Sequence, residues 1–486
     1  MDQTVRVQAP PPYPSPSSEG EVRWGCSSVA HALPDGHSGS HDTAPPSPSL
    51  RSGTSPSEEG EEHRPPPSER TSPPAFAVRR VGLTAFRSWR SVRLEVPARS
   101  VVLTGPNGAG KTNLLEALSL LAPGRGLRRA RMAALQTRGA AAGAETDRSE
   151  PGRPETPWAV SARLDTPDGP RRVGTGLDPA GEAAANPESA PGRRILRIDG
   201  IPAKGQGDLA ALGAVSWLTP EMDGLFTGPA GERRRFLDRL VAGFLPGHAA
   251  HVAAYGKAMR ERNRLLREPG AEAAWLDALE AAMAERGVAV AVARADFTAR
   301  LAAAGAGRVS AFPAPDLALA GAPDGADHAF AANGAALPAE DALRARLRAS
   351  RAADAEAGRA LAGPHRADLD VRLAGPDDRG ASGRGRPAAE CSTGEQKALL
   401  IALVLAAARL QAVERGAAPI LLLDEVAAHL DRERRAALFD EIEGLGAQAW
   451  MTGTDAALFD ALRGRACFVT AGNGALAVAD RPDAAA

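Results

Sequence analysis

Short segments in which apolar and polar residues alternate begin at residue 77. This period of two is typical of half-buried strands. It predicts strands at 78–84, 92–96, 100–104, 158–164, 195–198 and 215–218. The third of them enters a glycine-rich turn, after which 111–121 carries leucines at helical spacing and is expected to form a helix.

Helical periodicity replaces this pattern in the middle of the chain. Residues 229–304 and 339–361 are predicted to be mostly helical. No heptad seam runs long enough for a coiled-coil arm. The longest helical pattern, 271–304, would reach only about 50 Å at 1.5 Å per residue. We therefore expect a compact helical lobe.

The mixed pattern returns near the C-terminus. A strongly apolar helix is predicted at 395–408, a strand at 420–423, a charged helix at 431–443 and a last strand at 447–451. Both ends of the chain are therefore expected to build one α/β head, with the helical lobe inserted between them.

Composition separates an N-terminal tail from this body. Residues 1–75 hold 15 of the 40 prolines and almost no apolar run, so they are expected to be disordered. The other residues carry 53 basic and 49 acidic side chains, a balance that is compatible with nucleic acid but not diagnostic of it. Two Pro/Gly/Ala-rich stretches, near 139–157 and 178–193, are predicted to be loop insertions.

Cysteine usage and hydropathy indicate the compartment. The cysteines, Cys26, Cys391 and Cys467, have no disulfide or metal spacing, which favours reducing conditions. No window approaches 18 uninterrupted apolar residues, and the N-terminus lacks a secretory pattern. A cytosolic protein with no membrane span is expected.

The glycine-rich turn after the third strand carries a phosphate-binding motif. It matches G-x-x-x-x-G-K-[ST], or Walker A, in residues Gly105, Pro106, Asn107, Gly108, Ala109, Gly110, Lys111 and Thr112. Backbone N–H groups and a helix N-terminus converge on phosphate in such a loop. Lys111 would reach the β- and γ-phosphates of ATP, and Thr112 would ligate Mg²⁺. A glycine turn beside a chance lysine is disfavoured, because the chain has only four lysines and the required strand and helix flank the motif.

Two carboxylates end the buried strand at 420–423, as in a Walker B motif. Asp424 would hold Mg²⁺ through water, and Glu425 would polarise the attacking water. Lys111, Asp424 and Glu425 are therefore the candidate catalytic residues. The alternative is a core strand that ends in acidic loop residues. Asp431 disfavours it, because this residue stands at the spacing of a D-loop.

Residues 392–396 (S-T-G-E-Q) resemble the signature motif of ABC and SMC ATPases. Ser392 and Gly394 are its candidate nucleotide-binding residues. Ser392 and Glu395 also have the spacing of a helix capping box, and both interpretations hold together because a capped helix N-terminus attracts phosphate. In this group of ATPases the signature serine contacts the γ-phosphate bound by the other subunit, so that ATP joins two heads.

These motifs define the predicted fold class: an α/β, ABC/SMC-type P-loop ATPase head formed from both ends of the chain, with an inserted helical lobe and no long coiled coil. Thr452 or Thr454 is the candidate switch residue, and Gln136 is the candidate Q-loop residue. The expected divisions are a tail at 1–75, head parts at 76–218 and 366–475, the lobe at 219–365 and a C-terminal tail at 476–486.

Several segments resemble the RecF family in sequence and in order. They are 83–89 (L-T-A-F-R-S-W), 124–128 (G-R-G-L-R), 218–221 (L-T-P-E), 232–238 (E-R-R-R-F-L-D), 260–266 (R-E-R-N-R-L-L) and 363–369 (G-P-H-R-A-D-L). Ser88 and Trp89 depart from the family pattern. The resemblance covers about 78–470.

This resemblance implies a weak, DNA-stimulated ATPase that uses ATP and Mg²⁺. It implies a homodimer that forms on ATP at single-stranded or gapped DNA and at junctions with duplex. RecR, RecO and RecA are the implied partners, in RecA loading, replication recovery and the SOS response.

Two arginine clusters are candidate DNA contacts. Arg235 and Arg239 stand at i,i+4 on a predicted helix, a like-charge pair that costs about 0.2–0.5 kcal/mol and that a phosphate backbone would relieve. The alternative is a solvated face paired with nearby carboxylates. Arg125 and Arg128 belong to the second cluster. Few aromatic residues accompany either cluster, so phosphate contacts rather than base stacking would dominate.

Three other functions are compatible with parts of the pattern. A transporter engine is disfavoured by the missing histidine switch and the large lobe. A nuclease of the overcoming-lysogenisation type would need a further metal domain, and only a short stretch follows the last predicted strand. A purely structural DNA-binding module is disfavoured by Glu425.

Overall fold

The structure, a computed structural model, describes most of the chain between residues 73 and 479. The described residues are 73–137, 157–178, 194–268, 270, 272–305, 311–321, 336–374, 385–428, 430–472 and 474–479. The tail predicted at 1–75 and both predicted loop insertions therefore lie almost entirely outside the described residues, as does most of the tail predicted at 476–486.

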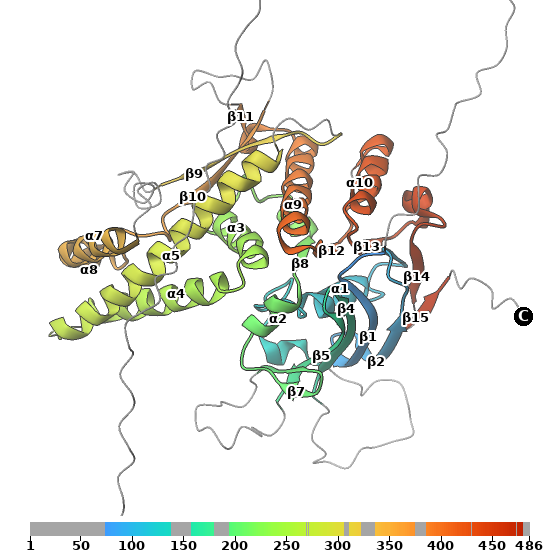
Figure 1. The fold of residues 1–486 in the computed structure, drawn as a ribbon, viewed down its shortest axis with the longest axis horizontal. Coiled ribbons are helices and arrows are strands. Elements are labelled where there is room, and N and C mark those ends of the chain that lie inside the picture. The colour runs from blue at the N-terminus through green and yellow to red at the C-terminus, as the bar shows by residue number, and fades with distance from the viewer. Residues whose placement is uncertain are drawn as a thin grey trace, which may run out of the picture. The chain divides into compact units, whose positions relative to one another are not determined.

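A central six-stranded sheet has the order β15-β14-β3-β13-β12-β8 (Figure 1). Its strands are β3 (Val101–Thr104), β8 (Val215–Leu218), β12 (Ile420–Leu423), β13 (Ala449–Gly453), β14 (Cys467–Gly472) and β15 (Ala475–Val478). Neighbouring strands are parallel except β14 and β15. Strands from both ends of the chain interleave in this sheet, as the sequence predicts.

The central strands are apolar at successive positions because both faces of the sheet are covered. Leu421 and Leu423 of β12 contact one core, whereas Ile420 and Leu422 contact the other. The first core includes residues of three helices, α3 (Ala230–Phe244), α9 (Thr393–Arg415) and α10 (Arg432–Gly444). The second includes residues of α1 (Lys111–Ser119) and of a second sheet.

The second sheet is antiparallel and has the order β2-β1-β4-β5-β6-β7. Its strands are β1 (Ala77–Phe86), β2 (Trp89–Glu95), β4 (Ala159–Thr166), β5 (Gly169–Leu177), β6 (Arg194–Ile198) and β7 (Ile201–Pro202). One face alternates into the core that it shares with α1, and the other face is exposed. A short helix, α2 (Gly207–Leu212), leads back to β8.

Helices dominate the inserted lobe. They are α4 (His248–Leu265), α5 (Ala273–Gly305), α7 (Ala336–Ala349) and α8 (Arg351–Ala357), and α5 is the long helix expected from the periodicity. A small antiparallel sheet, β11-β10-β9, adjoins them (Figure 1). Its strands are β9 (Pro315–Ala320), β10 (Asp368–Leu373) and β11 (Arg386–Pro387).

Helix α9 forms the core between the lobe and the central sheet. Among the described residues it is the one helix long and apolar enough to cross a membrane, and 67% of its most apolar window is buried within the protein. Its residues pack against α3, α5 and β8. This burial is what a core helix requires, so its apolar composition has a structural explanation.

The structure adds seven strands to those predicted: β5, β7, β9, β10, β11, β14 and β15. Strand β5 was missed because its sequence, G-P-R-R-V-G-T-G-L, is rich in glycine and arginine. Strand β9 was missed because it is short and lies within a helical region. The strand predicted at 447–451 is present as β13, but it is not the last one, because β14 and β15 follow it and β14 pairs with β3.

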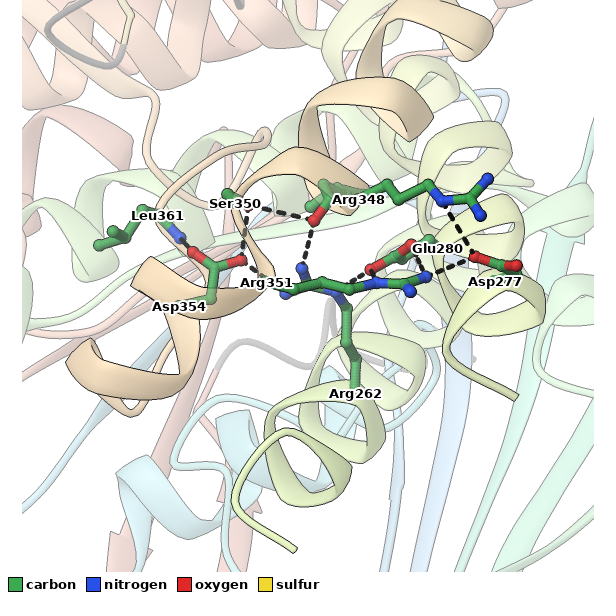
Figure 2. A network of polar contacts seen from close by, with 9 residues as sticks. Arg262, Asp277, Glu280, Arg348, Ser350, Arg351, Asp354 and Leu361 are labelled. Carbon is green, nitrogen blue, oxygen red and sulfur yellow. Dashed lines mark hydrogen bonds and ion pairs between the residues drawn. The ribbon is translucent and has the colours of Figure 1, made fainter. Parts of the chain in front are cut away.

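A buried ionic network fastens α4 to α5 and α8 within the lobe (Figure 2). Arg262 of α4 is fully buried and bonds Glu280 at 2.9 Å and Asp354 at 2.7 Å. Arg351 also pairs with Glu280, at 2.6 Å. Asp354 accepts two further hydrogen bonds, from the Ser350 hydroxyl at 2.8 Å and from the Leu361 N–H at 2.9 Å. Every charge in this network has an opposite partner, which is the condition for burying it.

Replacing Arg262 with Met is expected to destabilise the protein by about 3–5 kcal/mol, because two buried carboxylates lose their shared cation. Urea denaturation followed by circular dichroism measures this change. The matched control is Arg264→Met on the same helix, where the exposed pairs with Glu261 and Glu268 contribute little. Equal midpoints for both variants would contradict the role of the network.

Candidate functional site

Three neighbouring strands bring the predicted nucleotide-binding residues to one edge of the central sheet. Strand β13 lies between β3 and β12 and is parallel to both. The carboxyl ends of parallel strands meet at the same edge. The Walker A loop after β3, the carboxylates after β12 and Thr452 of β13 are therefore neighbours.

Glycines shape the Walker A loop at its two ends. Gly105 has φ 142°, and a Cβ there would lie 2.2 Å from the carbonyl oxygen of Ala471. Gly110 has φ 92° and caps α1, with the indole of Trp89 against it. Both positions combine a left-handed backbone with a close neighbour, so a larger residue would displace the loop.

Lys111 is held in this loop by its own backbone. Its Nζ donates to the carbonyl oxygens of Gly105 at 2.7 Å and Pro106 at 3.0 Å, and the residue is only 5% exposed. An ammonium group in this position stands where the loop N–H groups and the start of α1 converge, which is the place for a phosphate.

Hydrogen bonds at Asp424 link α1, β12 and β13. Its Oδ1 accepts from the hydroxyl of Thr112 at 3.1 Å and from that of Thr452 at 2.7 Å. The Thr452 oxygen in turn accepts from the backbone N–H of Glu425 at 2.9 Å. Glu425 has φ 52°, a strained conformation for this residue, and the Thr452 contact helps to hold it.

This geometry separates the two candidate switch residues. Thr452 is fully buried and touches both carboxylate-bearing residues, whereas Thr454 is exposed. The candidate Q-loop residue, Gln136, accepts the backbone N–H of Trp158 at 2.9 Å. Its side chain therefore holds the start of β4.

The oxygen donors at this edge fit a magnesium ion. Mg²⁺ takes one or two protein oxygens and completes its shell with water and substrate phosphate. The Thr112 hydroxyl and the Asp424 carboxylate, 3.1 Å apart, are such a donor pair. No cluster of three or more His, Cys, Asp or Glu occurs among the described residues, so a site made only of protein ligands is not found there.

Ser392 and Gly394 lie at the start of α9, where Ser392 is the N-cap residue. Ser392 and Glu395 form the predicted capping box, with bonds of 3.3 Å and 2.7 Å, and Arg386 binds Glu395 at 2.7 Å. The bond from the Ser392 N–H is the main cause that lowers the pKa of Glu395. Ser392 is exposed, and a Cβ on Gly394 would meet nothing within 4 Å.

The D-loop candidate, Asp431, is exposed and caps α10 by accepting from the N–H of Arg434 at 2.7 Å. His429, within the same predicted motif, lies outside the described residues. His365, which the sequence places in a segment resembling RecF, bonds the Tyr255 hydroxyl at 2.7 Å and the Ala360 carbonyl at 3.0 Å. It therefore fastens the lobe.

Sequence reasoning missed a buried carboxylate beneath the Walker A loop. Glu116 of α1 is fully buried and binds Arg87 at 2.7 and 2.9 Å and Arg128 at 3.5 Å. The Trp89 indole donates to the Gly110 carbonyl at 3.2 Å. The segments 83–89 and 124–128 therefore hold α1 in place. The sequence signal for this contact was an acidic residue, Glu116, within the leucine-rich pattern of the predicted helix.

The first predicted arginine cluster is divided in the structure. Arg235 is exposed and lies 3.6 Å from Glu232. Arg239 instead stacks on Trp217, 4.4 Å from the ring centroid, and burial with the nearby Arg129 lowers its pKa to about 9. The prediction that Arg235 and Arg239 contact DNA remains a prediction, and in this structure the cation–π contact holds the guanidinium of Arg239 against Trp217.

The second cluster meets the first around a small cavity. Arg128, Arg129, Arg235 and Arg239 line a cavity of about 150 Å³ with Glu221 and Glu232. Arg128 also donates to Asn113 at 2.9 Å, and Arg125 is exposed. The two clusters, far apart in sequence, are thus one partly neutralised surface.

The Walker A loop, the paired strand-end carboxylates and the capped signature helix on this sheet define a P-loop ATPase head of the ABC/SMC type. A family model described as "AAA domain, putative AbiEii toxin, Type IV TA system" matches residues 100–166. A solved structure of "the recombination mediator protein RecF-ATPrS in RecFOR pathway" has TM-score 0.67 at 21% identity, over 85% of this chain and 100% of that chain. The structure of the RecF-ATP form has TM-score 0.65 at 20% identity, over 83% and 99%.

Curated relatives identify the family. The "DNA replication and repair protein RecF" of Agrobacterium fabrum is 46% identical over 402 residues, which is 82% of this chain and 98% of the relative. The protein of the same name from Allorhizobium ampelinum is 47% identical over 403 residues, or 82% and 98%. The chain therefore belongs to the RecF family.

Replacing Thr452 with Val is expected to slow ATP turnover roughly 5- to 150-fold, because the Glu425 N–H loses its acceptor at a cost of about 1–3 kcal/mol. Nucleotide affinity, measured by equilibrium titration, should change little, since no phosphate-binding group is removed. Thr452→Ser keeps the hydroxyl and should restore turnover. A valine variant with the parent's turnover would show that this contact does not position Glu425.

Proposed function

We propose that this protein is an ATP-dependent DNA-binding repair protein whose two heads close on ATP. The observation that carries the proposal is that the hydrogen bonds of Ser392 lie within its own capping box, whereas Lys111, Thr112 and Asp424 form a separate hydrogen-bonded set. Lys111, Thr112 and Asp424 form a phosphate and magnesium half-site at the sheet edge, whereas Ser392 is exposed at the start of α9, which contacts the lobe. A second copy brings a signature helix to the first copy's phosphate.

The side chains have distinct tasks in this proposal. Lys111 exchanges its loop carbonyls for the β- and γ-phosphates, and Thr112 with Asp424 holds Mg²⁺, which neutralises phosphate charge when bound. Glu425 accepts hydrogen bonds from the attacking water and takes its proton. Ser392 and the N–H groups at the start of α9 donate to the γ-phosphate across the interface, next to Asp431 of the D-loop.

The RecF relatives are the basis for the proposed pathway. We assign ATP binding and slow, DNA-stimulated hydrolysis to a homodimer on gapped or single-stranded DNA and its junctions. RecR, RecO and RecA are the proposed partners in RecA loading, replication recovery and the SOS response, in the cytoplasm. Arg125, Arg128, Arg235 and Arg239 remain proposed DNA contacts, and the tail, head and lobe divisions given above remain proposed domains.

Replacing Glu425 with Gln is expected to slow hydrolysis by about 10²- to 10⁴-fold, because the water loses its base. ATP binding should persist, so the variant should form a longer-lived dimer on gapped DNA, seen as slow dissociation in a surface-binding assay. Glu433→Gln, an exposed change on α10, is the matched control. Parent-like hydrolysis by Glu425→Gln would remove this residue from the proposed role.

A mixture of two inactive variants tests action between subunits. Ser392→Arg places bulk and positive charge at the proposed γ-phosphate contact and should block hydrolysis, as should Glu425→Gln. In a mixed dimer, one composite site combines an intact Glu425 with an intact Ser392 of the other copy. The mixture should therefore hydrolyse ATP faster than the sum of the separate variants.

Crosslinking provides the control for this experiment by counting the mixed dimers. If mixed dimers form and activity does not rise, Ser392 does not complete the neighbour's site. Parent-like turnover by Ser392→Arg alone would contradict the signature assignment itself.

A further inference from the structure

The exposed face of the antiparallel sheet carries a row of arginines. Arg80 of β1 stands directly opposite Arg163 of β4, and Arg163 stands directly opposite Arg172 of β5. Arg93 and Arg197 flank the row, opposite Gly82 and Gly174 respectively. All five arginines are exposed.

This arrangement is unfavourable for the sheet itself. Directly opposed side chains on one face lie about 4.5–5.5 Å apart at Cβ, and like charges in these positions destabilise a strand pair. A surface selected only for solubility would alternate the two signs. Arg80 is paired with Glu95, so Arg163 and Arg172 are the directly opposed pair whose repulsion an anion would relieve.

Few carboxylates remain to neutralise the row. Three line this region, and each is paired with an arginine: Glu95 with Arg80, Asp165 with Arg79, and Asp199 with Arg171. Among the described residues, Arg93, Arg163, Arg172 and Arg197 make no ion pair. The linings of the two grooves described below together hold seven arginines and three carboxylates, an excess of four positive charges.

The same face is hollowed between the arginines. Two adjoining grooves of about 1160 Å³ each share Arg80, Arg93 and Arg163 in their walls. Small residues, Gly82, Gly174 and Ser161 among them, line the second groove. From β2 to β6 the face crosses four strand spacings, roughly 19 Å, or between about five and six base-pair steps of 3.4 Å.

We infer that this arginine groove binds the phosphate backbone of a DNA duplex. Its lining holds no aromatic side chain, which disfavours a single strand that would need base stacking. Small residues permit close approach, and the hydroxyls of Thr84, Ser91 and Ser161 supply further phosphate donors. The inference rests on the proposed DNA-binding function and assigns it a surface that the two sequence-predicted clusters do not include.

The test is the double variant Arg163→Gln with Arg172→Gln, assayed with ATP on an unmodified duplex between about 50 and 200 mM salt. Losing two phosphate contacts should flatten the slope of log K against log salt by about 1.8 and weaken binding about ten- to thirty-fold near physiological salt. ATP turnover without DNA should be unchanged. The Tm without DNA should rise, because the opposed charges are gone.

The matched control is Arg267→Gln with Arg359→Gln, two exposed arginines of the lobe, which should keep the parent's slope. A double groove variant with the parent's slope and affinity would overturn the inference while leaving the proposed function intact. A parent that binds no duplex would refute both. If the groove variant loses only binding to poly-glutamate, the occupant is an acidic peptide and the duplex assignment is wrong.

Discussion

One carboxylate oxygen that accepts two hydroxyl donors sets the geometry of the head. Asp424 Oδ1 bonds Thr112 of α1 and Thr452 of β13, so α1, β12 and β13 must meet within hydrogen-bond distance. That requirement explains the parallel strands on either side of β13, whose carboxyl ends share an edge. Glu116 of α1 forms ion pairs with Arg87 and Arg128, and these contacts hold α1 in the position that the Asp424 hydrogen bond requires. A shift of α1 by a fraction of its pitch would break the hydrogen bond between Thr112 and Asp424, and with it the link between the Walker A segment and β12.

Much of the fold and the phosphate half-site could be predicted because their signals are local. The Walker A loop, the apolar strand before Asp424 and the long α5 each follow from spacing within one segment. The choice between Thr452 and Thr454 depends on the register of β13 against β12, which no single segment contains. Glu116 and its arginines, and the stacking of Arg239 on Trp217, likewise join distant segments. The arginine row could not be predicted from the sequence either, because it joins residues of several strands and because β5 lacks the composition of a strand.

The arginines of this protein have two opposite electrostatic environments. Inside the lobe, Arg262 is surrounded by carboxylates and a backbone carbonyl, so its charge is matched and the helices are fixed to one another. On the antiparallel sheet, Arg163 and Arg172 face each other across neighbouring strands, and within the described residues neither forms an ion pair. Matched charge gives the lobe a defined geometry, whereas unmatched charge costs stability and provides attraction for a polyanion. Both depend on the guanidinium, which binds in a planar fork and stays protonated.

The absence of lysine from the groove lining limits how the cell can control that surface. Guanidinium groups keep their charge across the whole physiological pH range, and lysine acetylation does not act on them. Neither a change in pH near neutrality nor the supply of acetyl donors would alter the charge of the sheet face. Ionic strength, which screens exposed charges, is the variable that changes its attraction for anions.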